Sequence, residues 1–236
     1  MRFSRWGTSY KIKPIGDSAI GIFFDEKIDE RVNDMVIEVS RRVEKRKTEG
    51  IIEVVPTYRT VCVYYNPLQI EYERLVETLR EIVSETKVGE RKERRVVKIP
   101  VAYGGDFGPD LKFVAEYNGL TEDDVIEIHS KPTYRVYMLG FTPGFAYMGG
   151  LDERIAAPRL ETPRKRVPAG SVGIAGKQTG IYPIESPGGW RLIGRTPLKL
   201  FDPKKDPPTL LLPGDLVKFV PIDKEEFYRI LKEESK

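Results

Sequence analysis

The chain has 236 residues, of which 40% are hydrophobic and 32% charged, and its formal net charge at pH 7 is +3. This length and composition allow one large or two small domains with a hydrophobic core. So small a net charge gives no reason to expect a nucleic acid or a membrane surface as partner. A single cysteine and a single histidine exclude an internal disulfide and the usual zinc sites. With no 18-residue apolar run and no apolar signal core at the N-terminus, we expect a cytoplasmic protein without a metal.

The first part of the chain predicts strands that alternate with helices. Two stretches, from Ile28 to Val43 and from Pro67 to Val83, each carry one apolar stripe at helical spacing, and Gly50 is a plausible stop after the first. Both helices can cover one face of a sheet, which favours an α+β sandwich. The predicted strands are Tyr10–Ile15, Ala19–Phe24, Ile51–Val55 and Thr60–Tyr65. The charged run Val88–Arg95 predicts a junction, so we expect a domain at 1–90 and a second at 91–236.

The second part predicts many short strands with few helices, which indicates a β-barrel or β-sandwich. Thr121 and Asp124 form a weak capping box at the start of a short helix. We expect a last helix to begin near Asp223 and to turn Phe227, Ile230 and Leu231 inward. The other predicted elements are a helix at Pro109–Tyr117 and strands at Val96–Tyr103, Tyr134–Leu139, Thr209–Leu212 and Leu216–Val220, the last two as a hairpin.

Glycine is concentrated between Gly140 and Phe201, where 11 of the 21 glycines lie. A segment of this kind suits short strands and shaped loops that present side chains to a small molecule. Phe145 and Trp190 stand beside glycines, as the walls of a pocket often do. An ordinary turn-rich β domain, with these aromatic rings in its core, is the alternative.

Two familiar functional motifs are almost matched in this segment, but each match is incomplete. Ser171 lies in an A-G-S-V-G stretch like a nucleophile elbow, but Arg164-Lys165-Arg166 stands where an apolar strand is needed. Gly176-Lys177 is similar to the end of a phosphate loop, but Ser171 replaces the first glycine and Gln178 follows the lysine. The chain is therefore not expected to bind ATP through such a loop.

The polar residues that remain suggest recognition of an anion. Arg195 with Thr196, and Lys177 with Gln178 and Thr179, supply donors for a carboxylate or an oxyanion, although Arg195 also fits a solvated strand edge. His129 is the one side chain that titrates near neutrality when unperturbed, so it is either an acid–base group or a capping and packing residue.

Several longer motifs resemble the allophanate hydrolase subunit 1 family, and the resemblance covers nearly the whole chain. They are F-T-P-G-F-A-Y from Phe141, P-A-G-S-V-G-I-A-G from Pro168, Q-T-G-I-Y-P from Gln178, S-P-G-G-W from Ser186 and I-G-R-T-P from Ile193. Shorter matches lie at Gly16–Ala19, Tyr103–Gly105, Pro109–Leu111 and His129-Ser130.

The resemblance implies a small α+β N-terminal domain followed by a cyclophilin-like β-barrel C-terminal domain. The family includes the B component of prokaryotic 5-oxoprolinase, which works with a C component, of the allophanate hydrolase subunit 2 family, and an ATP-using A component. In that scheme the A component phosphorylates 5-oxo-L-proline, and B with C completes ring opening to L-glutamate.

We therefore expect one component of an enzyme complex, inactive alone and binding no cofactor itself. The alternatives are a KipI-like inhibitor of a histidine kinase and a member of a urea carboxylase or allophanate hydrolase system. Neighbouring genes would distinguish these three possibilities.

Catalytic and binding roles can be assigned to residues at the positions where the motifs match. On these positions we expect Arg195 to bind the substrate carboxylate, Gln178, Thr179 and backbone N–H groups of the glycine loops to stabilise the developing oxyanion, and His129 to act as the acid or base. The further substrate-binding positions are Phe145, Ser171, Gly176, Tyr182, Gly189, Trp190 and Thr196.

Overall fold

In the computed structural model, residues 2–3, 9–25, 29–87 and 94–234 are described. The chain divides into two compact units, Met1–Glu93 and Arg94–Lys236, and each has a hydrophobic core of its own. Most of the predicted junction at Val88–Arg95 lies outside the described residues.

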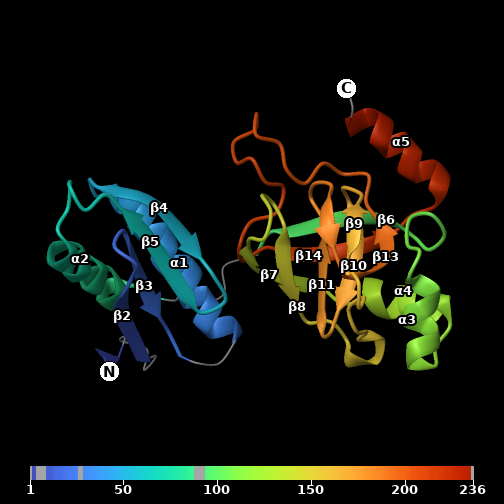
Figure 1. Ribbon diagram of the computed structural model, residues 1–236, viewed down its shortest axis with the longest axis horizontal. Coiled ribbons are helices and arrows are strands. Elements are labelled where there is room, and N and C mark those ends of the chain that lie inside the picture. The colour runs from blue at the N-terminus through green and yellow to red at the C-terminus, as the bar shows by residue number, and fades with distance from the viewer. Residues whose placement is uncertain (1, 4–8, 26–28, 88–93, 235–236) are drawn as a thin grey trace. The chain divides into compact units, whose positions relative to one another are not determined.

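Unit 1 is an antiparallel sheet with two helices on one face (Figure 1). Within the described residues its strand order is β1-β2-β3-β5-β4, and the helices are α1 (Glu30–Arg46) and α2 (Tyr72–Glu85). Alternate strand residues such as Ile20 and Val61 pack with Val36 and Leu75 of the helices, because strand side chains have a period of two. The strands are β1 (Arg2–Phe3), β2 (Ser9–Ile15), β3 (Ala19–Phe23), β4 (Ile51–Pro56) and β5 (Thr60–Tyr65).

The helix ends differ from the predicted ones for local reasons. Helix α1 stops at Lys47, which adopts a left-handed conformation with φ of 47°, three residues before Gly50. Helix α2 begins at Tyr72 and not at Pro67. Asn66 first forms a turn, in which its side chain accepts from the Leu68 N–H at 3.0 Å and its carbonyl from the Gln69 N–H at 3.0 Å.

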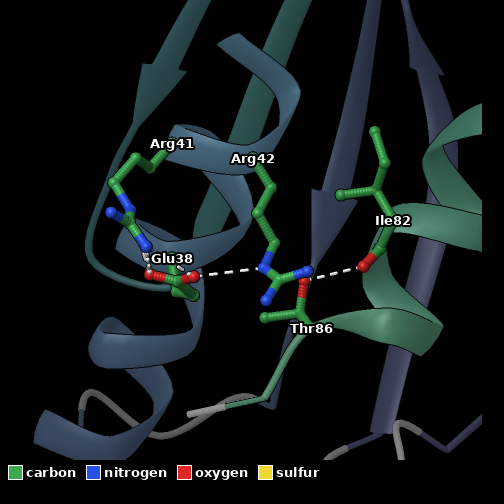
Figure 2. Close-up of polar contacts among 5 residues, drawn as sticks. All are labelled: Glu38, Arg41, Arg42, Ile82 and Thr86. Atoms are coloured by element: carbon green, nitrogen blue, oxygen red, sulfur yellow. Dashed lines mark hydrogen bonds and ion pairs between the residues drawn. The ribbon is translucent and has the colours of Figure 1, made fainter. Parts of the chain in front are cut away.

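Figure 2 shows polar contacts within these two helices, in the middle of α1 and at the end of α2. Glu38 of α1 accepts hydrogen bonds from Arg41, at 2.8 Å, and from Arg42, at 3.1 Å. Arg42 and Ile82 line the same small depression, so α1 and α2 lie side by side here. Thr86, which is fully buried, ends α2 by donating its hydroxyl to the carbonyl of Ile82 at 2.7 Å.

Unit 2 is a closed barrel, in which the described strands follow the order β10-β11-β8-β7-β14-β6-β13 (Figure 1). Its wall is antiparallel except where β14 (Leu216–Pro221) runs parallel to β6 (Val96–Tyr103). The other barrel strands are β7 (Tyr134–Leu139), β8 (Ala146–Gly149), β10 (Ser171–Ala175), β11 (Gln178–Ile181) and β13 (Arg191–Arg195). A separate ribbon pairs β9 (Arg164–Val167) with β12 (Ser186–Gly188). The predicted β-barrel is thus confirmed at the level of a mixed α+β fold with a closed barrel.

The predicted hairpin of Thr209–Leu212 with Leu216–Val220 is wrong. Strand β14 pairs with β6 and β7, and the 209–212 segment has only the isolated bridge between Thr209 and Phe201. The side chain and backbone N–H of Asp215 fix the turn before β14, because its carboxylate accepts from the Leu212 N–H at 2.8 Å and its own N–H donates to the Leu212 carbonyl at 3.1 Å.

The helices of unit 2 are α3 (Leu111–Asn118), α4 (Glu122–Ser130) and α5 (Lys224–Glu234), with a single 3₁₀ turn at Glu153–Ile155 among the described residues. The predicted capping box opens α4, since Asp124 N–H donates to the Thr121 hydroxyl at 3.1 Å and Thr121 N–H to the Asp124 carboxylate at 2.9 Å. In α5, Phe227 is buried as predicted and Ile230 is half-buried, but Leu231 is 37% exposed. No described helix is long and apolar enough to cross a membrane.

Candidate functional site

Three predicted site residues form a row on the outer face of the barrel. Ser171 of β10 lies opposite Arg195 of β13, and the N–H of Tyr182 donates to the Ser171 carbonyl at 2.9 Å. Residues opposite one another in antiparallel strands point to the same side of the sheet. The Arg195 guanidinium is anchored through Nε, which donates to the Ala169 carbonyl at 2.8 Å.

Beside this row an aromatic cluster packs over two glycines. Gly173 and Gly180 face one another across β10 and β11, and added β-carbons would lie 3.1 Å from Trp190 Cβ and 3.0 Å from Trp190 Cζ3. Two glycines are needed here because the indole occupies the space of their side chains. Phe145 meets Trp190 edge-on at 5.5 Å between ring centroids, and Tyr182 at the same distance. The predicted aromatic residues are therefore brought together, on the outer face and mostly buried.

Two further predicted site residues, Thr196 and Gly189, form backbone hydrogen bonds next to the aromatic cluster. Thr196 is buried, and its N–H donates to the Gly170 carbonyl at 2.9 Å, which fixes the chain just after Arg195. Gly189 precedes Trp190, and its carbonyl accepts from the Leu160 N–H at 2.8 Å. Both residues hold the backbone around the cluster.

His129 and Thr179 lie on the other side of the same wall, inside the barrel. The His129 side chain is fully buried, with Nδ1 2.8 Å from the Tyr103 hydroxyl and Nε2 2.9 Å from the Thr179 hydroxyl. Thr179 donates to the Gly173 carbonyl at 3.1 Å, so its oxygen accepts from His129 Nε2–H, and Tyr103 donates to the unprotonated Nδ1. The imidazole also stacks on Phe219 at 4.5 Å. Strands β6 and β11 are on opposite sides of the barrel, so the ring bridges its interior.

Burial lowers the pKa of His129 to about 3, so the imidazole stays neutral near pH 7. Both ring nitrogens already have partners, and no part of the side chain is exposed. The arrangement matches the packing alternative more closely than an acid–base group that meets a substrate from solvent.

Gln178 and Gly176 lie at the opposite end of β10 from Arg195. Gln178 pairs with Ala175 and Arg195 pairs with Ser171, and four residues of strand span about 13 Å. Gly176, with φ of 57°, opens the tight turn between β10 and β11, and Lys177 at its tip contacts Glu153 at 2.6 Å. Gln178 and Arg195 therefore lie at opposite ends of β10, and the expectation that they bind one small molecule stays a prediction.

Two residues that the sequence interpretation left without a role stand next to the outer row. Arg164 of β9 lies opposite Gly188 of β12, and it forms an ion pair with the buried Asp110 at 2.8 Å. The signal that could have found them is the repeated Pro-Arg pair at 158–159 and 163–164, inside the segment that precedes the glycine-rich strands.

The chain is similar to known proteins over most of its length. The family described as "Carboxyltransferase domain, subdomain C and D" matches residues 10–211, which include the outer row, the aromatic cluster and His129. The chain belongs to this family. The resemblance to the allophanate hydrolase subunit 1 family is thereby confirmed.

Curated relatives of the family match over most of their length. A protein of Bacillus subtilis, named as the B component of 5-oxoprolinase, is 47% identical over 96% of this chain and 98% of the relative. A protein of the same name from Haemophilus influenzae is 42% identical over 89% of this chain and 96% of the relative. Urea amidolyase of Lachancea kluyveri is more distant, at 28% identity over 89% of this chain but only 13% of that protein.

Solved structures show the same fold. The crystal structure of the conserved uncharacterized protein PH0987 from Pyrococcus horikoshii is 60% identical and covers 92% of this chain and all of its own, with a TM-score of 0.56. The crystal structure of TTHA0988 is 37% identical, and the match covers 87% of this chain and 40% of the TTHA0988 chain, with a TM-score of 0.77.

Proposed function

We propose that this chain is the B component of an ATP-dependent 5-oxoprolinase, which opens 5-oxo-L-proline to L-glutamate together with its A and C components. The observation that carries the proposal is end-to-end similarity. The Bacillus subtilis relative of that name is matched over 98% of its length at 47% identity. The urea amidolyase similarity covers 13% of a much longer protein, so it gives weaker support to a urea pathway.

In this proposal the chain leaves ATP to the A component. The stretch that is similar to a phosphate loop is a strand, a two-residue turn and a second strand. A phosphate loop leads into a helix, whose first N–H groups receive the phosphates. Here Lys177 is at the exposed tip of a hairpin and contacts Glu153. This geometry supports a division of labour in which ATP is bound by a partner.

The outer row is the part of the chain that we propose to face the lactam. Arg195 lies opposite Ser171 on the paired strand, and hydrogen bonds from its guanidinium to a negative oxygen that develops during ring opening would lower the barrier. His129, behind the wall, would then act by holding Thr179 and the backbone of Gly173 in place.

The test is reconstitution. The chain is co-expressed with candidate A and C components, and release of L-glutamate from 5-oxo-L-proline is measured with and without ATP. We expect ATP-dependent release by the complex and none by the chain alone. A complex that assembles but releases no glutamate would contradict the proposal, and release by the purified single chain would contradict the division of labour.

A further inference from the structure

The guanidinium of Arg164 is held in place at one of its terminal nitrogens by a carboxylate. Its Nη2 donates to Asp110 Oδ1 at 2.8 Å, while Asp110 Oδ2 accepts from the Leu192 N–H at 2.7 Å. Asp110 is only 6% exposed, and it stands just before α3. An arginine held by a buried carboxylate in this way is positioned before any ligand arrives.

The other edge of the same guanidinium has no partner among the described residues. Nη1 of Arg164 is buried without a hydrogen bond, although the side chain as a whole keeps 29% of its surface exposed. A buried donor on a charged group that lacks an acceptor is costly and calls for an explanation. The hydroxyl of Ser186, on the paired strand β12, is a second buried polar group without a partner in the described part of the chain.

The surroundings of this free edge are polar and positive. Arg164 lies opposite Gly188, where a β-carbon would come within 2.3 Å of the Tyr182 hydroxyl oxygen. The Tyr182 phenol therefore packs against the strand that pairs with Arg164. Burial raises the pKa of Tyr182, but the Trp190 backbone and the charges of Arg159 and Arg164 act in the opposite direction. The positive charges of Arg159 and Arg164 thus act on the Tyr182 phenol, which is neutral and can donate a hydrogen bond.

We propose that Arg164, together with the Tyr182 hydroxyl, binds the carboxylate of the small organic acid on which the complex acts. This inference rests on the proposed function and moves the carboxylate away from Arg195, whose Nε is occupied by the Ala169 carbonyl. A planar carboxylate has two oxygens, which match one free N–H edge and one hydroxyl donor. Asp110 positions Arg164 and does not touch the ligand.

The experiment compares the binding of a lactam that carries a carboxylate with the binding of the same lactam ring without it. Binding of 5-oxo-L-proline, L-glutamate and 2-pyrrolidinone to the full chain, and to its reconstituted complex, is measured by calorimetry. The variants are Arg164→Gln, Arg164→Lys, Arg195→Gln and, as matched control, Arg166→Gln. Arg166 is on the same strand, with a side chain that is 79% exposed and paired to Glu185.

We expect both Arg164 variants to bind 5-oxo-L-proline at least tenfold more weakly, and to lose the preference for it over 2-pyrrolidinone. Arg166→Gln should bind like the wild type, and Arg195→Gln should keep the preference. A thermal melt accompanies each variant, and Arg164→Lys retains a positive charge against Asp110 if the glutamine variant fails to fold. Unchanged preference in Arg164→Lys, or no carboxylate binding by wild-type chain or complex, would overturn the inference.

The two proposals fail separately. If the complex releases no glutamate while small carboxylates still bind in an Arg164-dependent manner, the proposed reaction is wrong and the anion site stands. If glutamate is released with an unchanged KM in folded Arg164→Lys, the reaction stands and the carboxylate is bound elsewhere.

Discussion

Nε2 of His129 lies 2.9 Å from the hydroxyl oxygen of Thr179 in the interior of the barrel. The bond joins α4 to β11, and Tyr103 continues the chain of hydrogen bonds to β6. Three elements far apart in the sequence therefore depend on one neutral imidazole.

This bond makes the stability of unit 2 depend on pH. The pKa of His129 is lowered from an ordinary 6.5 to about 3, so the unfolded chain binds a proton that the folded chain excludes. Stability is full above about pH 6.5 and falls as the pH drops toward 3, by about 1.4 kcal/mol per unit. Urea unfolding at pH 7.5 and at pH 5 should differ by about 2 kcal/mol from this group. His129→Gln serves as control, because it is the one histidine of the chain. An equal pH difference in both proteins would contradict the prediction.

Tyr103→Phe should destabilise unit 2 by about 1–3 kcal/mol, because His129 Nδ1 then loses its donor inside the barrel. The measurement is the free energy of unfolding in urea at pH 7.5. Tyr117→Phe is the matched control, since that side chain is 59% exposed on α3 and its loss of a hydroxyl should change stability by less than about 0.5 kcal/mol. Similar losses for the two variants would show that the Tyr103 hydroxyl is not specifically required.

Gly108→Ala should destabilise unit 2 by about 1–3 kcal/mol or more, because the new β-carbon would stand 2.0 Å from the Ile193 carbonyl oxygen. The backbone here cannot yield easily, since the Asp110 N–H donates to the Leu192 carbonyl at 2.8 Å in the same loop. Gly189→Ala is the control, with its nearest neighbours at an ordinary 3.6 Å. The melting temperatures decide: we expect a clear drop for Gly108→Ala and little change for Gly189→Ala.

Arg95→Met should cost about 1–3 kcal/mol, because it leaves the buried Asp215 carboxylate without its charged partner. Arg95 donates through Nε to Asp215 at 3.0 Å and through Nη2 to the Leu210 carbonyl at 2.8 Å. The paired variant Arg95→Met with Asp215→Asn should recover part of the loss, which urea unfolding measures. If the single variant melts like the wild type, Asp215 is satisfied by the Leu212 N–H alone.

Local patterns predicted the elements well where neighbours in sequence decide the structure. The capping box of Thr121 and Asp124 and the strand Val96–Tyr103 are present as expected, because turn chemistry and alternation act within a few residues. The hairpin of Thr209–Leu212 failed because the partner of β14 is β6, which lies about 120 residues earlier. No local signal carries such a pairing.

The candidate site shows the same limit. The glycine-rich segment suggested Phe145 and Trp190 as pocket walls, with core packing as the alternative, and the two rings lie with Tyr182 in a buried cluster. Which side of a barrel wall a strand residue faces depends on strand register, which separates Thr179 from Arg195 and Ser171, and His129 reaches Thr179 from helix α4. The sequence did not identify Arg164 as a candidate site residue, because the ion pair that positions it is formed with Asp110, 54 positions away.

The parallel pairing of β14 with β6 also sets an order of events during synthesis. The strand that closes the barrel spans Leu216–Pro221, so its partner β6, and the neighbouring β7, present unpaired edges until this strand has left the ribosome. Unit 1, complete by Glu93, is free to fold long before that moment. The nascent second unit is therefore the stage at which this protein is most exposed to aggregation, and the last of its barrel strands to be translated ends that exposure.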